Sequence, residues 1–179
     1  MPDFEDLVQK HEGMSLDGGR LVIDGDVLLP LSLDVEDLAW EPTVRLTYDF
    51  HCHEGWTRPG IVWEGVPVAS LLARARPRAT GRSVTVHAGT YTIVLPLEQA
   101  AAPGVLLALR QDGAPLEPQH GAPFRLVGPP EWDCYSSVKW VERLEITHEP
   151  ANASGPAIAL ARLNQTPITT TWSASRSGS

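Results

Sequence analysis

The sequence predicts a mixed α+β domain built mainly on β-sheet, with short helices. Many segments alternate apolar and polar residues at the strand period, whereas helical periodicity is confined to short stretches. Sixteen prolines and fifteen glycines punctuate the 179 residues and favour many turns. A chain of this length, with 42% apolar residues, suits one compact domain with its own core.

Strands are predicted wherever the alternation is sustained between turn residues. The clearest segments are RLVIDG at residues 20–25 and TVRLTYDFH at residues 43–51. Further strands are expected at residues 60–66, 82–88, 91–96, 105–113, 124–129 and 140–149.

Short helices are predicted at residues 33–39, 67–75 and 96–102. The helix at 67–75 places Val68, Leu71 and Leu72 on one apolar stripe, and Pro77 ends it. Asp34 is the expected N-cap of the helix at 33–39, because a carboxylate accepts hydrogen bonds from the first-turn amides.

Composition divides the chain into a domain at residues 1–150 and a tail at residues 151–179. The tail is rich in Ala, Ser and Thr and lacks a clear period, so we expect it to be flexible. The alternative is an extension that docks on the domain through Ile158, Leu160 and Leu163.

The net charge of −8 excludes nucleic acid as an expected partner, because no basic run could neutralise a row of phosphates. No apolar run is long enough to span a membrane, and the first residues carry no export signal, so we expect a cytoplasmic protein. The two cysteines, Cys52 and Cys134, are expected to be reduced, with a single bridge between them as the alternative.

The segment YDFHCHEGW at residues 48–56 is the first candidate site. Cys52 between His51 and His53 suggests zinc, but a strand sends alternate side chains to opposite faces, and no second Cys/His cluster completes a tetrahedron. A catalytic cysteine paired with His120 is another interpretation. A buried structural cysteine is the plainest, although the polar turn that follows places Cys52 where strand becomes loop.

A fourth interpretation makes Cys52 the single thiolate ligand of a metal whose other ligands belong to a cofactor. Such a cofactor is usually anchored by a phosphate, and residues 120–140 hold a compact set of anion donors. Arginine provides a planar fork for phosphate oxygens and lysine a compact charge, while hydroxyls and turn amides fill the remaining acceptors. The set consists of His120, Arg125, Ser136, Ser137 and Lys139.

Several motifs, in this order, resemble the molybdopterin-binding domain of the sulfite oxidase family, especially its small bacterial single-domain members. The resemblance covers residues 21–149. The motifs are VIDGDV followed by PLSLDVEDL, then TYDFHCHEGW, WEGVPVASLL, LPLEQA, LLALRQDGAPLEPQHGAPFRLV and SVKWVERLEI.

The resemblance implies a molybdenum ion held by the pterin dithiolene, oxo groups and one protein cysteine, here Cys52. It implies that His120, Arg125 and Lys139 bind the pterin phosphate, with Ser136 and Ser137 as further donors. His51 is expected to pack or hydrogen-bond near the pterin. His53 and Arg58 are candidates for contact with substrate or protons, and Cys134 is expected to be structural.

The resemblance therefore implies a molybdopterin-dependent oxidoreductase that transfers an oxygen atom to or from a small oxo-compound, of sulfite or sulfoxide type. No haem or flavin motif is present, so electrons are expected to pass to or from a separate partner. The alternative is a catalytically degenerate domain that binds the pterin or only a protein partner.

Overall fold

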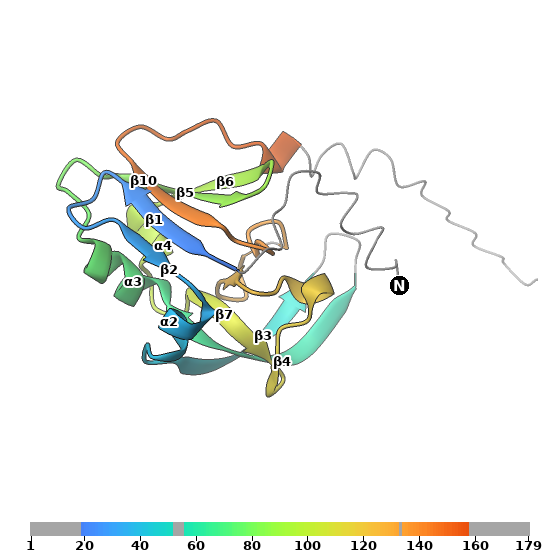
Figure 1. Ribbon diagram of the computed structural model, residues 1–179. Coiled ribbons are helices and arrows are strands. Elements are labelled where there is room, and N and C mark those ends of the chain that lie inside the picture. Colours follow the sequence, from blue (N-terminus) through green and yellow to red (C-terminus); the bar gives the residue numbers. More distant parts are fainter. Residues whose placement is uncertain (1–18, 52–55, 133, 158–179) are drawn as a thin grey trace, which may run out of the picture.

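The computed structural model describes residues 19–51, 56–132 and 134–157, which form two five-stranded sheets with a few short helices. Figure 1 shows the first sheet above the second, with α2 and α3 at the left of the view. The predicted α+β class, dominated by sheet, is confirmed.

The first sheet joins the two ends of the domain. Its central strand β10 pairs in parallel with β1 and antiparallel with β5, so the earliest and latest described strands lie side by side. The strand order is β2-β1-β10-β5-β6. The bounds are β1 Leu21–Gly25, β2 Leu31–Leu33, β5 Ser83–Ala88, β6 Tyr91–Pro96 and β10 Arg143–Thr147.

The second sheet is antiparallel throughout and runs in the order β3-β4-β7-β8, with β9 paired to β7. Its bounds are β3 Val44–His51, β4 Thr57–Pro67, β7 Leu106–Gln111, β8 Ala114–Pro115 and β9 Arg125–Val127. The β4–β7 register shifts at Gly65, where an added Cβ would collide with the carbonyl oxygen of Leu107, so only glycine fits this crossing.

The helices are α2 Val35–Ala39, α3 Val68–Ala75 and α4 Leu97–Ala100, with a 3-10 turn η1 at Pro118–His120. Asp34 is the N-cap of α2, as predicted, and forms a capping box with Asp37. The predicted apolar stripe of α3 is buried. No helix in the described part is both long and apolar enough to cross a bilayer.

Two apolar clusters hold the sheets. The main core combines residues of the first sheet and α3 with one face of the second sheet, represented by Val66, Leu107 and Leu126. The opposite face of the second sheet carries a smaller cluster around Trp63 and Val127. Because side chains alternate along a strand, neighbouring Leu126 and Val127 belong to different clusters.

Three elements were not predicted from the sequence: β2, β8 and η1, which are only two or three residues long. The predicted strand at 140–149 is shorter, because Trp140 adopts a left-handed conformation with φ of 57° and strand β10 starts only at Arg143. The strand predicted to begin at residue 60 instead begins at Thr57.

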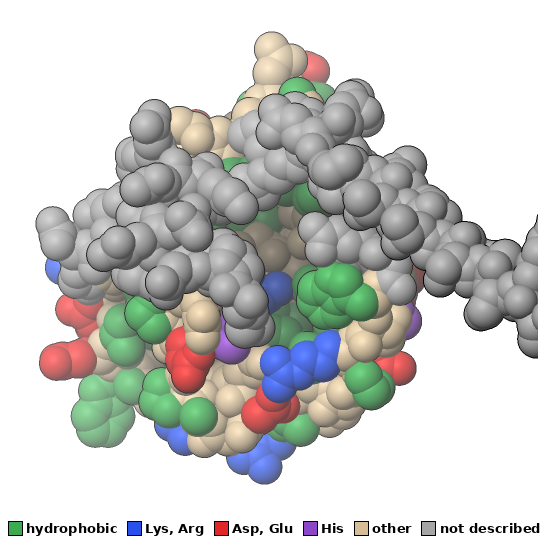
Figure 2. All heavy atoms as spheres, turned by 90° about the vertical axis from the view of Figure 1, so that its right-hand side faces the viewer, with side chains coloured by type: hydrophobic (Ala, Val, Ile, Leu, Met, Phe, Trp, Pro, Cys, Tyr) green, Lys and Arg blue, Asp and Glu red, His purple; other side chains and the backbone are tan. Residues whose placement is uncertain are grey.

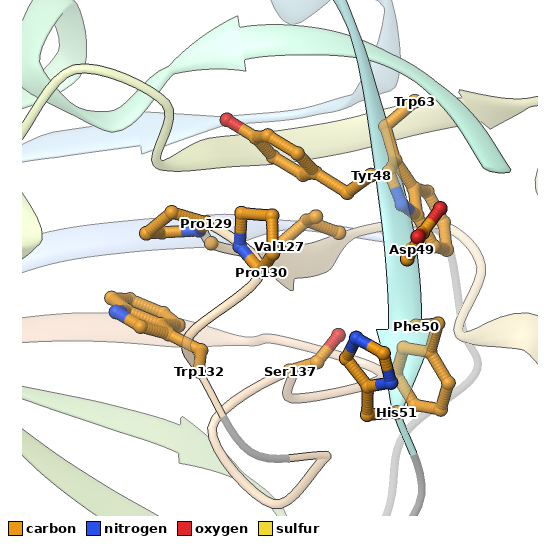
Figure 3. A pocket seen from close by; sticks show the side chains of 11 residues that line it. Tyr48, Asp49, Phe50, His51, Trp63, Val127, Pro129, Pro130, Trp132 and Ser137 are labelled. Atoms are coloured by element: carbon orange, nitrogen blue, oxygen red, sulfur yellow. The ribbon is translucent and has the colours of Figure 1, made fainter. Parts of the chain in front are cut away.

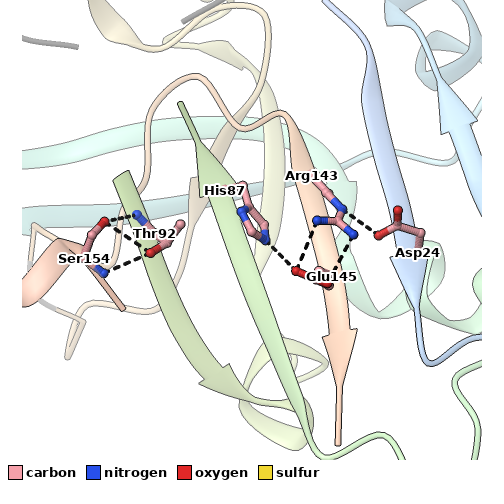
Figure 4. Close-up of polar contacts among 6 residues, drawn as sticks. All are labelled: Asp24, His87, Thr92, Arg143, Glu145 and Ser154. Carbon is pink, nitrogen blue, oxygen red and sulfur yellow. Dashed lines mark hydrogen bonds and ion pairs between the residues drawn. The ribbon is translucent and has the colours of Figure 1, made fainter. Parts of the chain in front are cut away.

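A chain of charged side chains crosses the outer face of the first sheet (Figure 4). Arg143 on β10 pairs with Asp24 on β1 at 2.7 Å and with Glu145 at 3.2 Å, and Glu145 also lies 2.9 Å from His87 on β5. Hydrogen bonding to Asp24 raises the pKa of Arg143 above the usual value of an arginine. These pairs link three neighbouring strands and satisfy one another's charges.

The first residues after Pro150 contact the edge strand β6. The Thr92 amide donates to Ser154 Oγ at 2.9 Å, and the Ser154 amide donates to Thr92 Oγ1 at 2.9 Å (Figure 4). Gly155 is buried against Tyr91 and Thr92. The boundary after residue 150 stays a prediction, and residues 158–179, with their expected flexibility or docking, lie outside the described residues.

We expect Leu144→Ala to lower the free energy of unfolding by about 3 kcal/mol, because Leu144 is fully buried at the centre of the first sheet. Thr47→Ala, at an exposed position of β3, is the control and should cost less than about 1 kcal/mol. Denaturant titration of both variants measures this. Equal losses would contradict the assignment of the core.

Candidate functional site

Arg125 on β9 is a buried cation on the face of the second sheet that carries the smaller apolar cluster. Its side chain is only 5% exposed. Its guanidinium carbon lies 5.3 Å from the ring centre of Phe50 and 5.0 Å from that of Trp63. Aromatic faces attract a cation, so the two rings hold the guanidinium in place.

The hydrogen bonds of Arg125 leave one corner of the guanidinium available. Nε donates to Ser137 Oγ at 3.1 Å and Nη1 donates to the carbonyl oxygen of His120 at 3.1 Å. Among the described residues, Nη2 has no hydrogen-bond acceptor and no carboxylate pairs with the group. A buried charge that meets only neutral partners is unusual, and it suits a site that receives an anion.

Burial lowers the pKa of Arg125 to about 10, because desolvation disfavours the charged form. The neighbouring Cys134, when ionised, acts in the opposite direction and favours the cation. Arg125 therefore remains protonated at neutral pH. Cys134 lies close enough to sense this charge, whereas Cys52 lies outside the described residues, so a bridge between them stays untested.

Gly121 brings His120 and Lys139 together, although they are far apart in the sequence. It follows η1 with φ of 107°, and an added Cβ would lie 2.9 Å from Lys139 Cβ. Lys139 Nζ donates to the carbonyl oxygen of Gln119 at 2.8 Å. The Trp140 indole donates to the carbonyl oxygen of Pro118 at 2.7 Å. These two hydrogen bonds join the segment at residues 139–140 to η1.

The surroundings of His120 lower the pKa of its imidazole. Burial lowers its pKa, and the positive charges of Lys139, Arg125 and Arg58 lower it further, while Glu117 opposes them. Three cations predicted from the sequence therefore act on one histidine. The structure places two predicted anion donors, Arg125 and Lys139, and the predicted substrate contact Arg58 within electrostatic reach of His120.

The two predicted serines lie in the turn at residues 134–137. Ser137 Oγ accepts from Arg125 and donates to the carbonyl oxygen of Leu126 at 3.2 Å, so it joins the turn to β9. Ser136 is the preceding residue and is half-buried. Ser137 is thereby shown to orient Arg125; whether either hydroxyl contacts a ligand stays a prediction.

A pocket separates the end of β3 from the loop after β9 (Figure 3). Tyr48, Phe50 and His51 line it from β3, and Trp132 faces them from the loop together with two prolines. The Tyr48 hydroxyl donates to the carbonyl oxygen of Gly104 at 3.1 Å, and burial raises its pKa. The pocket is therefore walled mainly by aromatic and proline side chains.

His51 lies at this pocket, but its described hydrogen bond is with protein. Its Nδ1 is 3.0 Å from Thr57 Oγ1 on the neighbouring strand. The predicted metal ligand Cys52 and its neighbour His53 lie outside the described residues. In the part of the chain that is described, no group of three or more His, Cys, Asp or Glu side chains could hold a metal ion.

Arg58 lies on β4 directly opposite Phe50, so both side chains project from the same face as Arg125. The space-filling view shows a hollow on this side of the molecule, with Lys or Arg atoms inside it and at its rim (Figure 2). Arg58 is half exposed and pairs with Asp112 at 2.7 Å. It is thus a cation at the edge of the site.

Sequence reasoning missed the aromatic frame and the acidic partner. From the sequence, Phe50 and Trp63 were assigned only to strands. Their contact with Arg125 arises only when β3, β4 and β9 come together in one sheet. Asp112 was read only as part of a strand ending at a turn. The sequence signal that could have found the frame is the alternation of Tyr48 and Phe50 just before Cys52.

Comparison with known proteins supports one family. The family described as "Oxidoreductase molybdopterin binding domain" matches residues 11–154. The uncharacterized oxidoreductase YuiH of Bacillus subtilis is 35% identical over 150 residues, which are 83% of this chain and 71% of YuiH.

Two other relatives are longer than this chain. The catalytic subunit MsrP of the protein-methionine-sulfoxide reductase of Gluconobacter oxydans is 33% identical over 150 residues, 73% of this chain and 47% of MsrP. The sulfane dehydrogenase SoxCD of Paracoccus pantotrophus superposes with a TM-score of 0.71 at 27% identity, over 80% of this chain and 42% of the SoxCD chain. The chain thus spans less than half of either.

We expect Arg125→Met to leave the free energy of unfolding of the cofactor-free protein unchanged, or to raise it by up to about 2 kcal/mol. The substitution removes a buried charge that no carboxylate in the described part of the chain compensates, and it keeps the side chain's bulk. Denaturant unfolding of protein made without the cofactor measures this.

Arg143→Met is the matched control, because it removes an arginine that is paired with Asp24 and Glu145. It should destabilise the protein by leaving two carboxylates without their cation. A loss on Arg125→Met as large as that on Arg143→Met would show that Arg125 is structurally compensated, contrary to its assignment as an anion receptor.

The lowered pKa of His120 predicts how the free energy of unfolding depends on pH. Its folded pKa is lowered, so its contribution to stability is present above the unfolded pKa of about 6.5 and is lost as the pH falls through the folded pKa. Unfolding free energies at pH 7.5, 6.5 and 5.5 should therefore fall less steeply in His120→Gln than in wild type. Parallel curves for the two proteins would contradict this.

Proposed function

The chain belongs to the family of oxidoreductase molybdopterin-binding domains, and from that premise we propose that it transfers an oxygen atom to or from a small neutral oxo-compound. The resemblance read from the sequence is thereby confirmed, and so is its consequence that the cofactor is molybdopterin with molybdenum. The enzyme class is that of the molybdopterin-dependent oxidoreductases. The substrate, the electron partner and the residue roles are proposals.

One observation carries the proposal: a buried cation with an available donor lies next to the segment that leads to Cys52. Phe50, two residues before Cys52, contacts the Arg125 guanidinium. Arg125 and Lys139 both lie within electrostatic reach of His120. This donor set fits the phosphate of the pterin, because arginine and lysine are the side chains that best bind phosphate oxygens.

In this proposal the protein's residues divide the work. Cys52 supplies the thiolate that binds molybdenum, and Arg125, His120 and Lys139 hold the phosphate, with Ser136 and Ser137 beside them. The cofactor supplies two-electron oxygen-atom transfer when bound. The aromatic walls of the pocket exclude water from the buried donors, which strengthens their attraction for an anion. His51 is proposed to pack near the pterin and His53 to face substrate.

Two features favour a sulfoxide-type substrate over sulfite. Arg58, the cation at the edge of the hollow, is already paired with Asp112. Asp49 adds a carboxylate to the lining of the pocket. A dianionic substrate would therefore meet little net positive charge near Arg58 and Asp49. A neutral oxo-compound does not need that charge in order to bind. One relative carries methionine-sulfoxide reductase in its name, which agrees with this choice.

We further propose a separate electron-transfer partner, since the sequence carries no haem or flavin motif. The cytoplasmic location expected from the sequence stays a prediction. The competing function is that of a degenerate domain that binds the cofactor without turnover. Molybdenum content and turnover, measured together, distinguish that domain from an enzyme.

We expect protein made in a host that synthesises the cofactor to contain close to one molybdenum per chain, and Cys52→Ser to be strongly depleted, because a hydroxyl is a poor ligand for this soft site. Elemental mass spectrometry measures the metal. Arg125→Met should lower pterin and molybdenum together. Equal molybdenum in wild type and Cys52→Ser would sink the ligand assignment.

Turnover distinguishes the two functions. The loaded wild-type protein should reduce a sulfoxide with reduced viologen as electron donor faster than it oxidises sulfite with ferricyanide as acceptor, and Cys52→Ser should do neither. Full molybdenum loading without turnover of either compound would favour the degenerate domain.

A further inference from the structure

On the face of the second sheet that carries Arg125, the charge of the half-exposed Arg58 is cancelled by a neighbouring acid. Arg58 projects from the same face as Phe50 and Arg125, because it pairs directly with Phe50 across β3 and β4. Its Nη2 lies 2.7 Å from Asp112 Oδ2. Figure 2 shows acidic atoms beside basic ones at the rim of the hollow. The mouth of the site is therefore closer to neutral than its arginine alone suggests.

The fold holds Asp112 in this place. Asp112 and Gly113 form the tight turn between β7 and β8, with φ of 52° and 81°. Consecutive residues with positive φ in an Asp-Gly pair are typical of a two-residue hairpin. The second carboxylate oxygen, Oδ1, accepts from the Val62 amide on β4 at 3.0 Å. The carboxylate is thus fixed by the backbone of the strand that carries Arg58.

We propose that Asp112 is a specificity-determining residue: its carboxylate cancels the charge of Arg58 at the mouth of the hollow and so disfavours dianionic ligands relative to neutral ones. The inference rests on the proposed function only for the identity of the neutral ligand. The weaker binding of dianions follows from charge alone. A fixed carboxylate repels an approaching dianion whatever reaction takes place inside the site.

The other cations of the site do not replace Arg58 in this role. Arg125 is buried against the rings of Phe50 and Trp63, and the surroundings of His120 lower its pKa. Lys139 Nζ donates to a backbone carbonyl. Once a phosphate is bound, its own charge offsets Arg125 and Lys139. The balance between Arg58 and Asp112 then determines the sign of the charge met by a ligand at the rim.

Asp112→Asn tests the proposal with the smallest change. The amide oxygen of asparagine can still accept from Val62, and asparagine tolerates the left-handed conformation, so the turn is kept while one negative charge is removed. Glu64→Gln is the matched control. It removes the same charge from an acid of the same sheet that pairs with Arg45 at 3.0 Å. Glu64 lies six residues along β4 from Arg58, at most about 20 Å away at the usual rise per residue because the strand is irregular between them.

The first readout is the binding of sulfate, a dianion that the enzyme cannot turn over, to the cofactor-loaded protein by calorimetry. We expect Asp112→Asn to tighten sulfate binding about 3- to 10-fold at low ionic strength, and the gain to shrink in about 0.3 M salt. Glu64→Gln should change binding less than about 2-fold. Unchanged sulfate binding in Asp112→Asn, or an equal gain in both variants, overturns the proposal.

The second readout is the ratio of kcat/KM for sulfite to kcat/KM for a sulfoxide. Asp112→Asn should raise this ratio by a similar factor, through the value for sulfite. A tighter sulfate site without turnover of either compound would uphold the role of Asp112 and reject the proposed reaction. Turnover with an unchanged ratio and unchanged sulfate binding would uphold the reaction and reject the role of Asp112.

Discussion

The burial of one guanidinium is the constraint on which the second sheet depends. Arg125 occupies a position on β9 that alternation directs into the smaller apolar cluster, where a leucine would be the ordinary choice. The sheet accommodates the charge with the rings of Phe50 and Trp63 and with two neutral oxygens from the loops. The turn that holds Ser137 and the turn that ends at His120 are both positioned by this one side chain.

This arrangement would join the proposed cofactor site to the fold. Among the described residues no carboxylate pairs with the buried charge, which costs free energy, and in the proposed function an anion would supply that interaction. The loops around Arg125 would then gain stability from the ligand, while in the first sheet Arg143 is already paired with Asp24. In this proposal the second sheet binds the ligand, and the first sheet is stable without it.

The sequence was a good guide to elements and a partial guide to the site. Period-two alternation located most strands, and Asp34 marked the start of α2, because both signals are local. The two-residue strand β8 and the left-handed Trp140 depend on pairing and packing between distant segments, so no local pattern could reveal them. The donors around Arg125 were predicted by residue type, but its burial between Phe50 and Trp63 requires knowledge of which strands are neighbours. The pairing of Arg58 with Asp112 requires the same knowledge.

The contact between Ser154 and Thr92 also bears on how the protein behaves in a crowded solution. Among the described strands, β6 is one of the two edges of the first sheet, and an open edge can recruit a strand from another molecule. The Thr92 amide, which faces away from β5, already donates to Ser154 Oγ. Gly155 lies against the same stretch of backbone. Ser154 thus occupies one backbone amide through which a second copy of this sheet could otherwise pair, and Gly155 packs against the same stretch of β6.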